Sequence, residues 1–484
     1  MARLVLRRQH HRTIDPAMTD AMISSRALVV DPALLRKYEF SGPRYTSYPT
    51  ADRFSDRFRP ADGLRQLAGR RERRADGPVS IYVHLPFCDT VCYYCACNKV
   101  VTRDRARAAE YLAYLEREIV TQRGALDRDE TVAQLHWGGG TPTFFSGDEM
   151  ARLVELLGRY FTLSADGEYS VEVDPRRIAD GTIARLGALG FNRLSLGVQD
   201  FDPVVQKKVN RVQTVEETAR VALAARASGF RSVSFDLIYG LPAQSVQSVG
   251  RTLATVLQLR PDRISLYNYA HLPTVFMPQR RIDAAELPSA AEKIGILTLA
   301  IDALTSAGYV YIGMDHFALP EDDLAQAQAR GTLQRNFQGY STHARADLLA
   351  FGVSAIAAVG DTYAQNHRTL EEYYASLERG ELPVFRGHRL SADDLVRREA
   401  IQELACRFRL GYAEFGQRLG IDAPGYFAAE RGRLAELESD GLIEADSDGI
   451  VVTARGRLLV RVVCMAFDRY LSGAPGAARY SRVI

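Results

Sequence analysis

Between about Val79 and Ala270, short runs of β-branched residues alternate with stretches of helical periodicity. Such alternation is typical of βα units, because neighbouring parallel strands need a crossover helix between them. The sequence therefore predicts an α/β fold with an incomplete parallel (β/α)6 barrel. The expected strands are Ser80–Leu85, Ala133–Trp137, Tyr169–Val173, Arg193–Val198, Ser232–Ile238 and Arg263–Tyr269, and the expected helices include Ala106–Gln122 and Thr214–Ser228, which opens with a Thr214/Glu217 capping box.

Residues able to do chemistry follow the ends of these strands, where barrel enzymes place their active sites. A cysteine loop follows the first strand and Gly138-Gly-Gly-Thr-Pro142 follows the second, while Glu172, Asp174, Gln199, Asp236 and Tyr239 end the next three. We expect the three glycines to let the backbone approach a ligand closely and to leave N–H groups free for a carboxylate. Either strand-end carboxylate, Glu172 or Asp236, would bind a ligand or merely cap a helix.

The cysteines of this chain are grouped rather than dispersed. Six occur in 484 residues, and four of them, Cys88, Cys92, Cys95 and Cys97, lie within one stretch of ten. Because a disulfide framework would distribute them along a small secreted chain, the grouping indicates metal ligands in a reducing, cytoplasmic compartment.

We expect neither a secretory signal nor a membrane span. The 61 basic and 59 acidic residues nearly cancel, so charge gives no argument for nucleic-acid binding.

Cys88, Cys92 and Cys95 have CxxxCxxC spacing. A [4Fe-4S] cluster normally takes four thiolates, so three would leave one iron open to a small molecule. Two alternatives stay open on the residues alone, besides inert packing. A zinc site would need a further ligand pair at the usual interval, and Cys97 as a fourth ligand would give a closed electron-transfer cluster.

Several motifs together resemble one family. They are Tyr82-Val-His-Leu-Pro-Phe-Cys88 with the run to Cys97, Trp137-Gly-Gly-Gly-Thr-Pro142, Val171-Glu-Val-Asp-Pro175, Gly197-Val-Gln-Asp200, Asp236-Leu-Ile-Tyr-Gly-Leu-Pro242, Asn268-Tyr-Ala-His-Leu-Pro273, Gly313-Met-Asp-His-Phe317, Asn336-Phe-Gln-Gly-Tyr340, Gly352-Val-Ser-Ala-Ile356 and Ser481-Arg-Val-Ile484. From Leu35 onward the chain resembles the oxygen-independent coproporphyrinogen III dehydrogenases, which are radical S-adenosylmethionine enzymes of haem synthesis.

The resemblance implies a [4Fe-4S] cluster on Cys88, Cys92 and Cys95, with Cys97 in the motif but not a ligand. It also implies two S-adenosylmethionine molecules. The residues matching contacts to the molecule on the cluster are Tyr82, Gly139, Glu172 and Ile356; those matching contacts to the second are Tyr94, Gly140, Thr141, Gln199, Arg211, Asp236 and Ala270. Relatives also carry phenylalanine at the Tyr94 position, and either residue provides an aromatic face.

The implied reaction is oxidative decarboxylation of two propionates of coproporphyrinogen III to vinyl groups, giving protoporphyrinogen IX. The implied partners are this substrate and an unidentified electron donor of flavodoxin or ferredoxin type, with a monomeric chain and no nucleic acid or membrane. Four substrate carboxylates need cationic partners, and Arg44 is a candidate because its segment resembles the amino-terminal, active-site-proximal region of the family. His271 and His316 are further candidate pocket residues, although buried structural histidines are commoner.

The expected organisation has five parts: an extension over 1–30, which lacks fixed structure or precedes the true start; an amino-terminal segment over 31–77; the barrel core over 78–320; a connection over 321–389; and a mostly helical, winged-helix-like domain over 390–484 that covers the active site. In the last part we expect helices at Ala392–Phe408, Tyr412–Leu419, Pro424–Ser439 and Arg455–Tyr470, with a β-ribbon at Leu442–Thr453.

Three rival functions carry different expectations. A haem-binding chaperone with the same barrel would typically lack both a cysteine at position 97 and the amino-terminal segment. A radical methyltransferase or cyclopropanase would be expected to diverge in the carboxyl-terminal domain. A closed ferredoxin-like module would bind no S-adenosylmethionine.

Overall fold

The computed structural model describes residues 28–72, 77–126, 130–176, 178–343, 346–471, 480 and 482. Most of the predicted 1–30 extension and most of the terminal Ser481–Ile484 motif therefore lie outside the described residues. No helix in the described ranges has both the length and the apolar character needed to cross a membrane.

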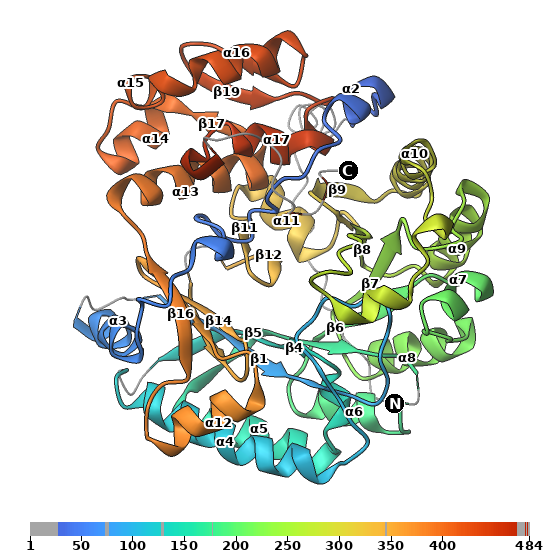
Figure 1. The fold of residues 1–484 in the computed structure, drawn as a ribbon, viewed down its shortest axis with the longest axis vertical. Coiled ribbons are helices and arrows are strands. Elements are labelled where there is room, and N and C mark those ends of the chain that lie inside the picture. Colours follow the sequence, from blue (N-terminus) through green and yellow to red (C-terminus); the bar gives the residue numbers. More distant parts are fainter. Residues whose placement is uncertain are drawn as a thin grey trace, which may run out of the picture.

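Six parallel strands form the middle of one twelve-stranded sheet and confirm the predicted incomplete barrel (Figure 1). They run in chain order as β1 (Val79–Leu85), β4 (Thr131–Gly139), β5 (Thr162–Val173), β6 (Arg193–Gln199), β7 (Ser232–Tyr239) and β8 (Arg263–Asn268). Because these six strands are parallel, their carboxyl ends meet along one rim.

Helices cover the outside of these strands. They are α4 (Ala106–Arg123), α5 (Gly147–Tyr160), α6 (Thr182–Ala188), α7 (Pro203–Lys208), α8 (Val215–Ala227), α9 (Val246–Leu259) and α10 (Ala290–Ser306). The predicted Thr214/Glu217 capping box begins α8, and Gly229 after it has the expected left-handed φ of 85°. In α5 the apolar face is buried against the sheet through Met150, Leu153, Leu156 and Leu157, and each such side chain contributes roughly 1.5–3 kcal/mol.

The sheet extends beyond the six predicted strands on both sides. On the β1 side it continues through β13 (Asp347–Phe351), β14 (Ile356–Val359), β15 (Thr362–Asn366) and β16 (Val384–Arg389), and on the β8 side through β10 (His316–Ala318) and β9 (Val310–Gly313). The strands predicted from the sequence end with Arg263–Tyr269 and do not include these. These strands have three to six residues each, too few for a clear alternating pattern.

A hairpin of β11 (Gln334–Asn336) and β12 (Gly339–Ser341) lies between the barrel and the carboxyl-terminal domain (Figure 1). Gln402 of the latter accepts from the Arg335 amide at 3.0 Å and donates to its carbonyl at 2.6 Å. At the other end, the Ser341 hydroxyl donates to Gln134 of β4 at 2.9 Å. The hairpin therefore ties the two parts together. Elsewhere the chain forms α11 (Asp323–Arg330), α12 (Leu370–Glu378), which packs against α4, and the short 3-10 helices Met277–Arg281 and Ala284–Glu286.

The carboxyl-terminal domain has the predicted order of short helices and a β-ribbon. It comprises α13 (Ala392–Arg407), β17 (Arg409–Gly411), α14 (Tyr412–Leu419), α15 (Ala423–Tyr426), α16 (Arg431–Ser439), β18 (Ile443–Ala445), β19 (Gly449–Val452) and α17 (Val460–Met465), with 3-10 turns at Ala428–Glu430, Arg457–Leu459 and Arg469–Leu471. The prediction of one helix over Arg455–Tyr470 is wrong. The chain breaks near Asp468, whose carboxylate accepts from the Tyr470 amide at 2.9 Å and starts a new turn.

The amino-terminal segment holds α2 (Pro32–Lys37), α3 (Pro60–Glu72) and a 3-10 turn at Ala51–Arg53. It is bound on both sides. Arg461 of α17 donates to the carbonyl of Pro43 at 3.0 Å, and the Tyr45 hydroxyl donates to Asp468 at 3.0 Å. From the same stretch, Arg44 pairs with Asp315 next to β10 at 2.5 Å. The segment thus lies between barrel and carboxyl-terminal domain, which brings Arg44 to the barrel interior.

Candidate active site

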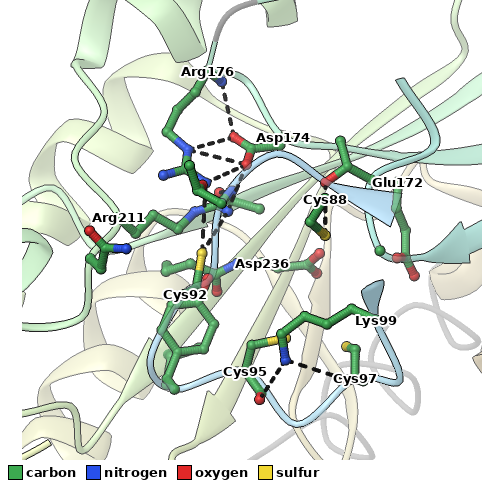
Figure 2. Close-up of a pocket in the computed structure, with 18 of the residues that line it drawn as sticks. Cys88, Cys92, Cys95, Cys97, Lys99, Glu172, Asp174, Arg176, Arg211 and Asp236 are labelled. Carbon is green, nitrogen blue, oxygen red and sulfur yellow. Dashed lines mark hydrogen bonds and ion pairs between the residues drawn. The ribbon is translucent and has the colours of Figure 1, made fainter. Parts of the chain in front are cut away.

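The cysteine loop leaves β1 and is closed at its base by a short parallel pair, β2 (Phe87–Cys88) and β3 (Val100–Val101). Between these strands the chain curves around one side of a cavity (Figure 2). All four clustered cysteines line that cavity, and their exposure differs: Cys92 is buried, Cys88 and Cys95 are half-buried, and Cys97 is exposed.

Hydrogen bonds from neighbouring loops hold the cysteine loop in place. The amide of Tyr93 donates to the carbonyl of Val209 at 3.0 Å, and the Asn210 side chain donates to the carbonyl of Val91 at 2.7 Å. Within the loop, the Lys99 ammonium donates to the Cys95 carbonyl at 3.1 Å. The loop is therefore positioned mainly by its backbone, which leaves the thiols directed to other partners.

The glycine turn after β4 packs directly against this loop. A Cβ atom at Gly140 would lie 2.5 Å from the Pro86 carbonyl oxygen. Gly139 has a φ of 113°, and its Cβ would lie 2.6 Å from the His84 ring. Both positions require glycine because of these close approaches.

We expected the turn to leave N–H groups free for a ligand. This expectation is wrong for the amides of Gly139, Gly140 and Thr141, because each of them donates to an acceptor within the protein. The Gly140 amide donates to the Leu85 carbonyl at 2.9 Å, and the Thr141 amide donates to the Phe87 carbonyl at 2.8 Å. The Gly139 amide donates to the Glu172 carboxylate at 3.3 Å. These groups instead hold the cysteine loop and a strand-end carboxylate.

Two guanidinium groups lie beside the sulfur of Cys92 (Figure 2). The Arg211 Nη1 is 3.6 Å from Cys92 Sγ, and the Arg176 Nη2 is 3.7 Å from it. Asp174 lies between the two arginines, at 2.6 Å from Arg176 and 3.0 Å from Arg211. Burial raises the pKa of Asp174, but Arg211 and Arg176 together lower it below its usual value. The result is a charged cluster directly at one predicted metal ligand.

Glu172 is part of a polar network on the opposite wall. Its carboxylate lies 3.2 Å from His136 Nε2, and the His136 ring stacks on Tyr82 with centroids 5.8 Å apart. The Tyr82 hydroxyl meets His84 Nδ1 at 3.0 Å. Burial raises the pKa of Glu172, but the contact with His136 and the Gly139 amide lower it below its ordinary value. Glu172 is thus held as an anion facing the cavity.

Asp236 lies deeper, in the middle of β7. The Ser195 hydroxyl donates to its carboxylate at 2.8 Å. Burial raises the pKa of Asp236 to about 6, and the bonds from Ser195 and Ser265 act in the opposite direction. Asp236 therefore changes charge near neutral pH while it faces the cavity.

The cavity has a volume of about 970 Å³. This is at the upper end for ligand sites, which typically enclose 300–1,000 Å³. The predicted site residues that line it are Cys88, Cys92, Cys95, Tyr94, Gly139, Gly140, Thr141, Glu172, Gln199, Arg211, Asp236 and Ala270, and the candidate Arg44 lines it too. The structure thus brings together side chains that the sequence spreads over more than two hundred positions.

Two predicted residues are placed elsewhere. Tyr82 lies behind His84, and Ile356 packs with a small apolar group that includes Phe54 and Tyr363. Neither is among the residues that line the cavity. Of the two candidate histidines, His271 meets the Tyr269 hydroxyl at 2.9 Å, whereas His316 lies in β10 beside Tyr267.

Sequence reasoning missed Arg176, Lys99 and Asn210. Arg176 stands two residues after the strand-end Asp174, where a cation beside an acidic residue was a usable signal. Lys99 and Asn210 act on loop carbonyls, and nothing in their sequence surroundings distinguishes them from surface residues.

The donor set of the loop fits an iron-sulfur cluster. Thiolate ligands select such clusters or zinc. Across the ranges that the structure describes, no three His, Cys, Asp or Glu groups lie close enough to hold one metal ion.

Comparison with known proteins agrees with this geometry. A family model described as "Radical SAM superfamily" matches residues 82–256, and one described as "HemN C-terminal domain" matches residues 390–459. The chain is 52% identical over 456 residues to the oxygen-independent coproporphyrinogen III oxidase of Pseudomonas aeruginosa, covering 94% of this chain and 98% of that one. It is 50% identical over 454 residues to the Escherichia coli protein of the same name, with the same shares covered.

A solved structure gives the same result for the fold. The structure of coproporphyrinogen III oxidase (HemN) from Escherichia coli, described as a radical SAM enzyme, superposes with a TM-score of 0.87 at 48% identity. The match covers 92% of this chain and 100% of the other. The similarity therefore extends through the barrel and the carboxyl-terminal domain.

Proposed function

This chain belongs to the family of oxygen-independent coproporphyrinogen III oxidases, and on that premise we propose that it converts two propionates of coproporphyrinogen III to vinyl groups, giving protoporphyrinogen IX. It is a radical SAM enzyme. The observation that carries the proposal is a three-cysteine loop on one wall of a polar cavity, in a chain that also carries the family's carboxyl-terminal domain.

We assign the [4Fe-4S] cluster to Cys88, Cys92 and Cys95. When bound there, the cluster would supply the one-electron reduction of S-adenosylmethionine on which radical chemistry at a propionate depends. The chain's own residues fix where this happens. Val209 and Asn210 hold the loop backbone.

We further propose that two S-adenosylmethionine molecules bind in the cavity. The volume of the cavity, about 970 Å³, and its polar lining support this proposal. Glu172 and Gly139 are assigned to the molecule on the cluster, together with Tyr82 and Ile356, which the resemblance implies but which lie outside the cavity lining. The second molecule is assigned to Tyr94, Gly140, Thr141, Gln199, Arg211, Asp236 and Ala270, all of which line the cavity. The chain is proposed to act as a cytoplasmic monomer supplied by a flavodoxin or ferredoxin type donor.

The function is tested with the cluster reconstituted under anaerobic conditions, a reductant, S-adenosylmethionine and coproporphyrinogen III. We expect protoporphyrinogen IX with about two 5'-deoxyadenosines per product, because each propionate requires one hydrogen abstraction. Formation of 5'-deoxyadenosine without protoporphyrinogen would reject the substrate and favour the methyltransferase or haem-binding functions.

Arg176→Gln is expected to make the cluster harder to reduce. The reduced cluster carries one more negative charge, which a cation 3.7 Å from a ligand sulfur stabilises. Because Asp174 loses a partner at the same time, we expect only about a tenfold fall in the ratio of reduced to oxidised cluster at a fixed potential, or ~59 mV. The measurement is a redox titration followed by electron paramagnetic resonance.

The matched control for this titration is Arg185→Gln. Arg185 pairs with Asp148 at 2.8 Å on the helical exterior, so its loss makes the same change in charge away from the loop. Equal midpoint potentials for the two variants would show that Arg176 does not act on the cluster.

The affinity for S-adenosylmethionine is expected to fall as pH decreases through about 6. Only the ionised Asp236 accepts hydrogen bonds from ribose hydroxyls with both oxygens, and burial raises its pKa to about 6. Below that pH we expect roughly a tenfold loss per pH unit for the second molecule, because each unit lowers the ionised fraction tenfold. Asp236→Asn should bind weakly at pH 8 and show no such slope. Calorimetric titrations of both proteins at several pH values measure the affinity. An equal change of affinity with pH in the wild-type protein and in Asp236→Asn would contradict the assignment.

A further inference from the structure

One wall of the cavity is formed by Arg44 and Tyr267, and a cationic cluster lies directly behind it. The Arg44 guanidinium lies 5.8 Å from the centre of the Tyr267 ring. Tyr267 meets the His316 ring edge to face at 5.9 Å. The backbone carbonyl of Arg44 accepts from Arg335 Nε at 3.4 Å. Arg335 and His316 are therefore one residue away from the cavity.

Arg335 is held in a buried position and forms no ion pair with the carboxylates of the described residues. Its exposed fraction is 4%, and its guanidinium lies over the Tyr340 ring at 4.8 Å. Among the ion pairs of the described part of the chain, none includes Arg335. Its Nη1 also has no hydrogen-bond acceptor there, and the same holds for His316 Nδ1. A buried guanidinium without an anionic partner is costly, so the position points to a ligand.

The surrounding charges favour an anion. Arg44 is paired with Asp315, and Arg263 with Asp322, so the local carboxylates already have partners. Arg461, which donates to the Pro43 carbonyl, adds another cation on the far side of Asp315. Burial and the charge of Arg335 lower the pKa of His316 to about 3, so its imidazole is neutral and offers one N–H. The cluster thus has donors and positive charge in excess.

We propose that Arg335, together with His316 and Arg44, forms a subsite for a propionate carboxylate that the substrate keeps, an inference that rests on the proposed function. A carboxylate matches the planar fork of a guanidinium, and coproporphyrinogen III carries four. A propionate that loses carbon dioxide gives up its charge. Strong pairing would stabilise its ground state and oppose the reaction, so this subsite suits an anchoring carboxylate.

The test compares Arg335→Gln and Arg335→Lys in the reconstituted holoenzyme. Gln402 binds the backbone of Arg335 through both its amide and its carbonyl, and these two hydrogen bonds stay available in both variants. Losing a buried charge-assisted hydrogen bond costs about 1.5–3 kcal/mol, which corresponds to a dissociation constant for coproporphyrinogen III about 10- to 100-fold higher. We expect Arg335→Gln to raise KM by a similar factor with kcat nearly unchanged, and Arg335→Lys to give an intermediate loss.

The control is Arg457→Gln. Arg457 also lies over an aromatic ring, that of Phe408, at 5.0 Å. Its carbonyl accepts from the Tyr311 hydroxyl at 3.5 Å, so it is held by a residue outside the Arg44 segment. Substrate binding by Arg335→Gln as tight as that of the control would overturn the subsite, and so would a fall in kcat at unchanged KM. Failure of the wild-type enzyme to bind coproporphyrinogen III would instead reject the proposed function itself.

Discussion

Cys92→Ser is expected to abolish cluster binding and with it all formation of 5'-deoxyadenosine. Cys92 is the buried member of the loop, and its sulfur has the guanidinium groups of Arg211 and Arg176 at 3.6 and 3.7 Å. Iron requires a thiolate ligand, whereas a serine hydroxyl stays protonated. Iron and sulfide analysis with the visible absorption spectrum measures the loss directly.

Cys97→Ser is the matched control for this variant. Cys97 lies two residues after Cys95 and is exposed, unlike the three predicted ligands. We expect this variant to keep its iron and its spectrum. Loss of the cluster in both variants would identify Cys97 as a fourth ligand and support the closed electron-transfer site.

Gly140→Ala is expected to displace the cysteine loop. The new Cβ would lie 2.5 Å from the Pro86 carbonyl oxygen and 2.8 Å from that of Phe87, and backbone atoms cannot move aside as a flexible side chain can. Overpacking of this kind costs about 1–3 kcal/mol. Because the displaced atoms carry Cys88, we expect at least a tenfold loss of S-adenosylmethionine affinity and reduced iron content.

Gly158→Ala is the control for that experiment. Gly158 lies within α5, where an added Cβ meets nothing within 4 Å, so alanine should stabilise the helix by about 0.5–1 kcal/mol. Thermal unfolding distinguishes the two changes. Iron content and affinity in Gly140→Ala equal to those of Gly158→Ala would mean that the turn tolerates a side chain and does not position the loop.

The parts of the fold that the sequence predicts well are those with strong local signals. Thr214 and Glu217 place the start of α8 at the observed residue. The parallel strands were also found, because long helices separate them and their apolar runs are continuous. Since the carboxyl ends of such strands must share one rim, the grouping of Cys88 and Glu172 followed from the sequence, whereas Asp236, expected at a strand end, lies in the middle of β7.

What the sequence could not predict depends on distant partners. The strands from β13 to β16 are short and gain their stability by pairing, which begins with β13 beside β1. The N–H groups of the glycine turn bind backbone carbonyls across the site, and no local pattern reveals this. Arg335 resembles any surface arginine in the sequence and becomes a candidate only when its hairpin is placed between two domains.

The most direct test of the central claim uses coproporphyrinogen III deuterated at the β-carbons of its propionates. The account predicts that 5'-deoxyadenosine released during anaerobic turnover contains deuterium and that protoporphyrinogen IX forms with it. Unlabelled 5'-deoxyadenosine beside labelled, unreacted substrate would contradict the account, because the radical would then not act on the propionates.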